Sequence, residues 1–304
     1  MDLLQLKYFR EVARTQQLSK TAQKLHIAQP SLSQTLKRLE TELGCSLFDR
    51  QGKGICLNQA GTIFFRYVEQ VFTALDNARL ELDELKSSED QTVSLYVGSA
   101  SMLLPAIVRR IQEKDPGIRL QITQQPPSPN DPLPALSLTS VHTLLPDSNS
   151  RIFLLREPIK AVLPSNHRLA GRSALTLDEI RGESFSELVS GTNLTSIVRH
   201  YCERYHFSPN VTTVADTPAV MRDLLPLGPG IAFIPEYTWH DFLTPSMSLK
   251  AVSGMPMERF LMLSWNPESF QTSAVRTCRD VIVRYFKEYT QAHPVTSVQP
   301  LHNT

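Results

Sequence analysis

A ladder of four leucines behind a single proline constrains this chain more than any other feature. The leucines recur at steps of four, three and four residues, which is the spacing of one buried helix stripe. They are Leu32, Leu36, Leu39 and Leu43. Pro30 suits the first turn of a helix, where its missing N–H would be unpaired, and Gly44 provides a stop. We therefore predict a helix over residues 30–43.

A shorter helix precedes this ladder across a break at residues 26–28. Leu18, Ala22 and Leu25 recur at helical spacing, and Ser19 is a candidate N-cap. An apolar stripe over residues 3–13 supplies a further helix that can cover the pair. A helix, a tight turn and a second helix form the hairpin that reads DNA when the second helix enters the major groove.

The side of the second helix opposite the leucines is polar. Hydroxyls, amides and cations suit phosphate oxygens and base edges. The candidate DNA-contacting residues on this helix are Gln29, Pro30, Ser31, Ser33, Gln34, Lys37 and Arg38. The same composition also fits an ordinary solvated helix face, so the DNA interpretation depends on the neighbouring segments.

A β-hairpin is predicted directly after the ladder. Two short apolar strands at residues 47–48 and 55–57 flank a glycine-bearing tip. Arg50 and Lys53 lie at that tip, where they can contact the DNA backbone or the minor groove. Asn58 is a candidate N-cap for the next helix.

Residues 59–86 give an uninterrupted helical pattern with a heptad seam. Its members are spaced alternately by four and three residues: Phe64, Val68, Val71, Leu75, Ala78, Leu82 and Leu85. Such a seam favours self-pairing of two copies, although a single amphipathic helix packed on its own domain is the alternative. A dimer of DNA readers requires an inverted-repeat operator in double-stranded DNA.

Charge separates the first two segments. Residues 1–58 hold nine Lys/Arg against five Asp/Glu, whereas residues 59–91 hold three against seven, within a chain of net charge +1. The basic N-terminal segment indicates an anionic partner for that segment alone.

From about residue 92 the pattern changes to α/β. Strands are predicted at residues 93–97, 118–123, 135–139, 153–163, 184–188, 211–214, 231–235, 249–252 and 260–265. Helices are predicted at residues 103–114, 195–207, 218–225 and 270–291. Strands that alternate with helices favour parallel sheets.

At this point residues 3–61 resemble the winged helix-turn-helix of LysR-type transcriptional regulators. The stretches that carry the resemblance are LQLKYFREVA, LSKTAQKLHIAQPSLSQTLKRLETELGCSLFDR and LNQAG. It implies a linker-helix dimer, dimers paired into tetramers, a small-molecule effector held between two α/β subdomains like those of a periplasmic binding protein, and contact with RNA polymerase. One departure is Ala28, where the family usually has Ser or Thr; Gln29 can partly substitute for that hydroxyl.

Polar residues at the expected strand ends are candidate effector contacts. They are Ser99, Ser101, Ser190, Thr192, Asn193 and Thr217, although helix capping is the commoner use of Ser and Thr. A proline-rich stretch, QQPPSPNDPLP at residues 124–134, forbids the regular helix that the family places there. One wall of the expected cleft is therefore rebuilt or missing.

The predicted fold class is mixed, with three parts. Residues 1–58 form a winged helix-turn-helix, residues 59–88 a dimerisation helix, and residues 92–294 an effector-binding α/β domain. Within it, subdomain I takes about 92–160 and 267–294 and subdomain II about 161–266, with crossings near residues 158–164 and 265–267.

Several functions are disfavoured by what the sequence lacks. No apolar run is long enough to span a bilayer and the first residues do not resemble a signal peptide, so we expect a cytoplasmic protein without membrane contact. Four scattered cysteines favour neither disulfides nor zinc, and no catalytic or cofactor motif is present. We predict a ligand-responsive DNA-binding regulator without enzymatic activity, cofactor or metal. The alternatives are an enzyme with an accessory DNA-binding module and a regulator that has lost its ligand.

Overall fold

A computed structural model of the chain describes residues 1–51, 54–86, 91–128, 133–228 and 230–293. The chain divides into two compact units, which are described separately below. The first comprises Met1–Ser88 with Pro127–Leu133 and Pro267–Thr272, and the second comprises Glu89–Pro126, Pro134–Asn266 and Ser273–Thr304. No described helix is both long enough and apolar enough to cross a membrane.

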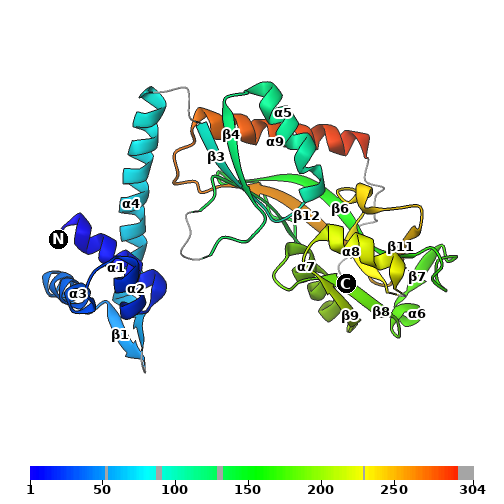
Figure 1. Ribbon diagram of the computed structural model, residues 1–304, viewed down its shortest axis with the longest axis horizontal. Helices are drawn as coiled ribbons and strands as arrows, with labels where there is room; N and C mark the ends of the chain where they lie inside the picture. Colours follow the sequence, from blue (N-terminus) through cyan, green and yellow to red (C-terminus); the bar gives the residue numbers. More distant parts are fainter. Residues whose placement is uncertain (52–53, 87–90, 129–132, 229, 294–304) are drawn as a thin grey trace. The chain divides into compact units, whose positions relative to one another are not determined.

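The first unit contains three short helices, a β-hairpin and one long helix (Figure 1). They are α1 (Leu3–Thr15), α2 (Leu18–Lys24), α3 (Gln29–Leu43), β1 (Phe48–Gln51), β2 (Gly54–Leu57) and α4 (Gln59–Lys86). The helix-turn-helix and the hairpin are confirmed, since β1 and β2 pair antiparallel.

The leucine ladder faces the core of this unit. Leu32 and Leu39 are fully buried and Leu36 is nearly so, whereas Leu43 is only half-buried against the same cluster. Gly44 ends α3 in the left-handed conformation, at φ 71°, as the sequence indicated.

Two predicted caps have different outcomes. Asn58 does cap α4, because its side chain accepts from the backbone N–H of Gly61 at 2.8 Å. The assignment of Ser19 as the N-cap of α2 is wrong: the helix begins at Leu18, Gln17 holds the cap position, and the Ser19 hydroxyl bonds elsewhere.

The second unit is α/β throughout. Its first half contains β3 (Gln91–Val97), η1 (Ser101–Leu103), α5 (Leu104–Lys114), β4 (Ile118–Thr123), β5 (Leu136–Val141) and β6 (Arg151–Pro164). There follow β7 (Ala174–Thr176), α6 (Leu177–Ile180), β8 (Ser184–Leu188), α7 (Asn193–Arg204), β9 (Asn210–Ala215), α8 (Pro218–Leu224) and η2 (Leu225–Leu227). The chain continues through β10 (Ala232–Pro235), η3 (His240–Phe242), β11 (Met247–Ser253), β12 (Met257–Ser264) and α9 (Ser273–Ala292).

The strands form a long sheet and a short one. The long sheet has the order β4-β3-β5-β12-β6-β11-β7, with β10 also paired to β6, and the short one pairs β8 with β9. Parallel pairing, the sequence-based expectation, holds for β3 with β4 and β5, β7 with β11, and β8 with β9. It fails for β6 and β12, which pair antiparallel to each other and to their other neighbours.

Two hydrophobic cores lie along these two antiparallel strands. One core includes Leu155 of β6 and Leu261 of β12, under α5 and α9, which lie side by side (Figure 1). The other includes Ile159 of β6 and Met257 of β12. The chain therefore passes from one core to the other within β6 and returns within β12, earlier than the predicted second crossing at residues 265–267.

Candidate DNA-reading face and ligand cavity

The outer face of α3 is uniformly exposed and polar. Every candidate DNA-contacting residue between positions 29 and 38 is exposed: Gln29, Pro30, Ser31, Ser33, Gln34, Lys37 and Arg38. The buried leucines on the inner side fix this orientation, because turning the polar face inward would expose them. The hydroxyls, amides and cations of the helix are thus available to an outside partner.

The first turn of α3 lacks a side-chain cap. Ala28 occupies the cap position and makes no cap hydrogen bond, while Pro30 stands within the first turn. Gln29 does not cap the helix either: its side-chain carbonyl accepts a hydrogen bond from the Ser19 hydroxyl at 2.9 Å. Gln29 therefore is the first polar side chain at the exposed end of α3.

The β-hairpin next to α3 carries the two remaining basic candidates. Arg50 lies in β1, paired across the hairpin with Ile55, but its side chain is outside the described part of the structure. Lys53 lies outside the described residues altogether.

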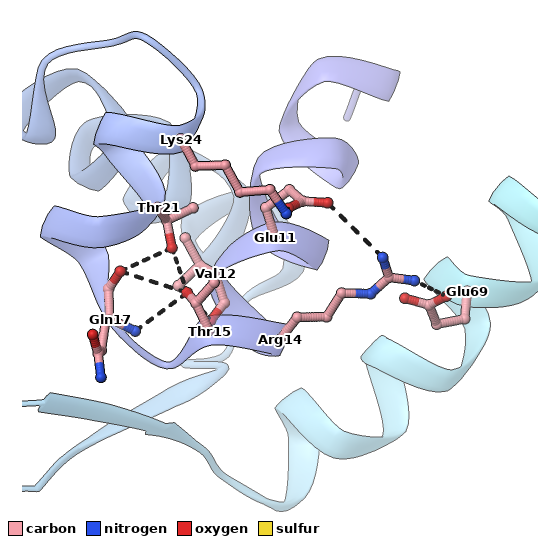
Figure 2. A network of polar contacts seen from close by, with 8 residues as sticks. All are labelled: Glu11, Val12, Arg14, Thr15, Gln17, Thr21, Lys24 and Glu69. Atoms are coloured by element: carbon pink, nitrogen blue, oxygen red, sulfur yellow. Dashed lines mark hydrogen bonds and ion pairs between the residues drawn. The ribbon is translucent and has the colours of Figure 1, made fainter. Parts of the chain in front are cut away.

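A polar network fastens the helix-turn-helix to α4 (Figure 2). Glu11 of α1 is 7% exposed, and its carboxylate pairs with Lys24 Nζ of α2 at 2.7 Å. Arg14 reaches from α1 to Glu69 of α4, with Nη2 to Oε2 at 2.9 Å. Because the C-terminal part of α1 forms ion pairs with both α2 and α4, the direction of α4 is coupled to the placement of the helix-turn-helix.

The residues of the predicted dimerisation seam of α4 are not all exposed: those near the start of the helix are buried or half-buried, and the described ones further along are open to solvent. Val68 is 2% exposed in the core of its own unit, and the Phe64 ring stands 5.0 Å from that of Phe9. The assignment of Val68 to a partner-facing seam is therefore wrong, since its side chain is buried in its own chain, whereas Phe64 is half-buried against the same core.

The exposed apolar stripe of α4 instead begins with two residues that the heptad reading missed. Ile63 and Tyr67 are 49% and 55% exposed. Beyond them the predicted seam is open to solvent at Val71, Leu75, Ala78 and Leu82, and the side chain of Leu85 is outside the described part. The heptad pattern alone does not distinguish Phe64 and Val68 from Ile63 and Tyr67, because the two residues of each pair are four positions apart.

A cavity of about 420 Å³ opens in the second unit, at the ends of the strands. All six candidate effector contacts line it: Ser99, Ser101, Ser190, Thr192, Asn193 and Thr217. Two of them also cap helices, since the hydroxyls of Thr192 and Thr217 accept from Thr195 N and Val220 N. Capping and cavity lining therefore coexist, as the alternative reading allowed.

Ser99 and Asn193 join the two halves of this cavity. The buried Ser99 hydroxyl, just beyond β3, lies 2.8 Å from the Ser140 hydroxyl and donates to Asn193 Oδ1 of α7 at 3.2 Å. Gly98 permits this approach, because a Cβ there would stand 2.6 Å from Asn193 Oδ1. A hydrogen bond thus joins two residues that line the cavity from different elements.

A buried ion pair at the cavity was not anticipated from the sequence. Arg259 of β12 lines the cavity and is 1% exposed, and its Nε donates to Glu157 Oε1 of β6 at 2.7 Å. Arg259 Nη2 also donates to the Thr238 hydroxyl at 2.7 Å. The available signal was weak, because the same two strands also carry Arg151, Arg156, Lys160 and Glu258, and an unpaired charge is costly only at a buried position.

The proline-rich stretch supplies irregular backbone to the cavity wall. Gln124, Gln125 and Pro126 line the cavity directly after β4. Residues 129–132 of this stretch lie outside the described part of the structure. The expected wall is therefore rebuilt from amide side chains and proline over its described portion.

The cavity wall includes one tyrosine, Tyr96. Burial raises the pKa of Tyr96, which lines the wall, so its phenol stays protonated at neutral pH. Within the described ranges, no group of three or more His, Cys, Asp or Glu side chains could hold a metal ion. The lining is instead rich in hydroxyl and amide groups that can hydrogen-bond a small ligand.

Both units match family models built from known proteins. Residues 3–62 match the family model "Bacterial regulatory helix-turn-helix protein, lysR family", and residues 88–287 match "LysR substrate binding domain". The chain is 29% identical over 298 residues to YybE, an uncharacterized HTH-type transcriptional regulator of Bacillus subtilis (strain 168), covering 95% of this chain and 100% of that one.

Solved structures share the fold. A full-length OxyR variant from Pseudomonas aeruginosa superposes with a TM-score of 0.59 at 19% identity, covering 99% of both chains. Full-length CbnR, solved in complex with its target DNA, gives a TM-score of 0.55 at 16% identity, covering 93% of this chain and 99% of that one.

Proposed function

The chain belongs to the LysR family of DNA-binding transcription regulators, and from that premise we propose which of its residues perform each task. The protein reads its operator through the exposed face of α3, pairs with a second copy through α4, and responds to a small molecule held in the cavity of the second unit. The regulator that has lost its ligand remains the alternative, and the cavity of about 420 Å³ favours retention of one.

The observation that carries the DNA-reading proposal is the orientation of α3. Its leucines are packed inward while seven candidate contacts are all exposed. With α3 in the major groove, Gln34 and Arg38 have the donors and acceptors to read base edges, and the hydroxyls of Ser31 and Ser33 can bind phosphate or base. Lys37 adds attraction to phosphates that does not depend on sequence. Arg50 and Lys53 of the hairpin are proposed to add backbone or minor-groove contacts.

The proposed dimer uses the exposed stripe of α4. Val71, Leu75 and Leu82 are 40%, 44% and 53% exposed, a large apolar area for one side of a single helix. Pairing this stripe with a second copy removes it from water and relates two α3 helices by a two-fold axis. The corresponding operator is an inverted repeat in double-stranded DNA, and a dimer of dimers would bind two such sites.

The cavity is proposed to couple ligand binding to DNA. Its wall comes from both cores, and a hydrogen bond between Ser99 and Asn193 joins the two sides. A small molecule that binds one arrangement of the two sides better than another shifts their equilibrium. The shift would change the spacing of the DNA-reading helices and their contact with RNA polymerase.

We propose no enzymatic activity for the chain, and a cytoplasmic location that matches its DNA partner. The cavity has hydroxyl and amide groups together with a neutralised ion pair. An enzyme with an accessory DNA-binding module would need a nucleophile next to a base, whereas the buried basic group of the lining, Arg259, is paired with Glu157.

A footprint tests the proposal as a whole. DNase protection on the DNA that flanks the encoding gene, repeated with a panel of small metabolites, reports the symmetry of the site and the response to ligand together. We expect two protected half-sites related by an inverted repeat, and a changed footprint with at least one metabolite. Protection without two-fold symmetry would contradict the dimer.

A further inference from the structure

The side chains of Ser19 and Gln29 join the starts of α2 and α3. The Ser19 hydroxyl donates to Gln29 Oε1 at 2.9 Å, and both residues are exposed. Neither side chain caps a helix, because Gln17 and Ala28 occupy the two cap positions and neither makes a cap bond. The bond therefore caps neither helix, and its effect is to set the direction of the Gln29 amide.

A glutamine amide has a different character at each of its two ends. The carbonyl accepts hydrogen bonds and the NH₂ group donates two. Because Ser19 binds the carbonyl of Gln29, the NH₂ group is the end left for an outside partner, and none of the described residues accepts a hydrogen bond from it. The pair thus presents a donor at the N-terminal end of the proposed reading helix.

We propose that Ser19 is a positioning residue for DNA recognition, which holds the Gln29 amide with its NH₂ group toward the duplex. In this orientation the NH₂ group suits a phosphate oxygen or the acceptor atoms of a purine edge. The proposal rests on the docking of α3 in the major groove.

Holding the amide has two consequences. Glutamine is rich in rotamers, and ordering it before DNA arrives lowers the entropic cost of the contact. Without the serine hydroxyl the amide can turn over and offer its carbonyl, which accepts from adenine N6 or cytosine N4 instead. Ser19 therefore sharpens the choice of base next to Gln29 if the contact is to a base edge, and strengthens binding in either case.

The test is a double-mutant cycle on the full chain. The DNA is a duplex selected by the native protein from a random-sequence pool. We expect Ser19→Ala to weaken binding to it by roughly 3- to 10-fold, the range for one neutral hydrogen bond. Gln29→Ala is expected to weaken binding further, and Ser19→Ala added to Gln29→Ala should change nothing more.

Two further variants separate positioning from folding. Ser19→Thr keeps a hydroxyl and should retain most of the native affinity. Thr41→Ala removes a hydroxyl that bonds the Lys37 carbonyl near the other end of α3, and it should bind as the native protein does. Thermal unfolding of each variant, measured beside the binding, should show the same midpoint for Ser19→Ala and Ser19→Thr.

The outcomes distinguish this inference from the docking on which it rests. If Gln29→Ala binds the selected duplex as well as the native protein does, the proposed docking of α3 fails. If Gln29→Ala is impaired while Ser19→Ala is not, or if the two losses add in full, only the positioning role of Ser19 is overturned. A loss in Ser19→Ala that Ser19→Thr does not restore overturns it as well.

Discussion

His142 and His200 stack against each other, with ring centroids 3.8 Å apart and ring planes inclined by 27°. His142 directly follows β5, in the half of the second unit that contains α5 and α9, whereas His200 lies on α7 in the other half. Together with the Ser99–Asn193 hydrogen bond, this stack gives α7 two contacts across the unit. Burial, and secondarily the neighbouring His200, lower the pKa of His142 below its ordinary value of 6.5.

The stack predicts an acid-sensitive second unit. Since the pKa of His142 is lowered in the folded state, the unfolded chain binds more protons as pH falls from about 6.5 toward the folded pKa, and stability is lost over that interval. The carboxylates on elements packed against α7 offer little compensation, because Glu187 and Glu258 are already paired with Arg199 and Arg156.

Thermal unfolding at several pH values measures this effect. We expect the midpoint of the second unit to fall on acidification from about pH 7.5 to about pH 5.5, and His142→Gln to reduce that fall. His240→Gln, which removes an exposed imidazole outside the stack, serves as the control and should keep the native slope. An unchanged slope in His142→Gln would contradict the role given to the stack.

The buried pair of Arg259 and Glu157 predicts a large loss of stability when one partner is removed. Arg259→Met leaves the Glu157 carboxylate buried without a countercharge, which typically costs about 3–5 kcal/mol in the free energy of unfolding. Adding Glu157→Gln removes the charge and should recover part of the loss. Denaturant unfolding of the second unit measures both changes.

Arg156 provides the matched control for that experiment. It also belongs to an Arg–Glu pair between β6 and β12, with Glu258 at 2.6 Å, but its side chain is 42% exposed. A pair of this kind contributes about 0–1 kcal/mol, so Arg156→Met should change stability little. Equal losses in the two arginine variants would show that burial does not set the cost.

Local patterns in the sequence predicted the local structure of the DNA-reading unit. The leucine ladder, Pro30 and Gly44 act within one helix, so their meaning does not depend on distant residues. The partner of Ser19 was missed for the opposite reason: its hydroxyl meets Gln29 of another helix rather than a backbone of its own. Serine often caps helices, but its hydroxyl can also bond a side chain of another helix, and here it does so.

Long-range packing explains the remaining differences. Phe64 and Val68 fit a heptad seam, yet α1 covers them, so the exposed stripe starts at Ile63 and Tyr67. The antiparallel pairing of β6 with β12 joins residues about a hundred positions apart, as Arg156 and Phe260 show. Alternation of strands and helices predicts parallel neighbours. It does not reveal that β6 leads the chain to a second core and that β12 leads it back, which makes these two strands antiparallel.

The exposed stripe of α4 predicts the effect of charge on assembly. Val71→Lys with Leu75→Lys places two ammonium groups in the proposed apolar contact, where burial without a partner is unfavourable. We expect a monomer by sedimentation equilibrium, and operator affinity lowered by more than roughly tenfold. Asp76→Lys makes the same change of +2 in net charge on another side of the helix and should leave the dimer intact. A dimer that survives the double substitution would place the contact elsewhere.

Two residues of α3 should respond differently to DNA sequence and to salt. Gln34 has both a donor and an acceptor for a base edge, so Gln34→Ala should cost about 1–3 kcal/mol of discrimination at one base pair and leave unrelated DNA bound as before. Lys37 is a point charge, so Lys37→Ala should weaken binding to all sequences alike and reduce the salt slope by about one. Affinities for selected and scrambled duplexes, measured across a salt series, separate the two effects. Both side chains are exposed on one helix, and therefore an equal, salt-independent loss in the two variants would mean that α3 does not enter the groove in the proposed orientation.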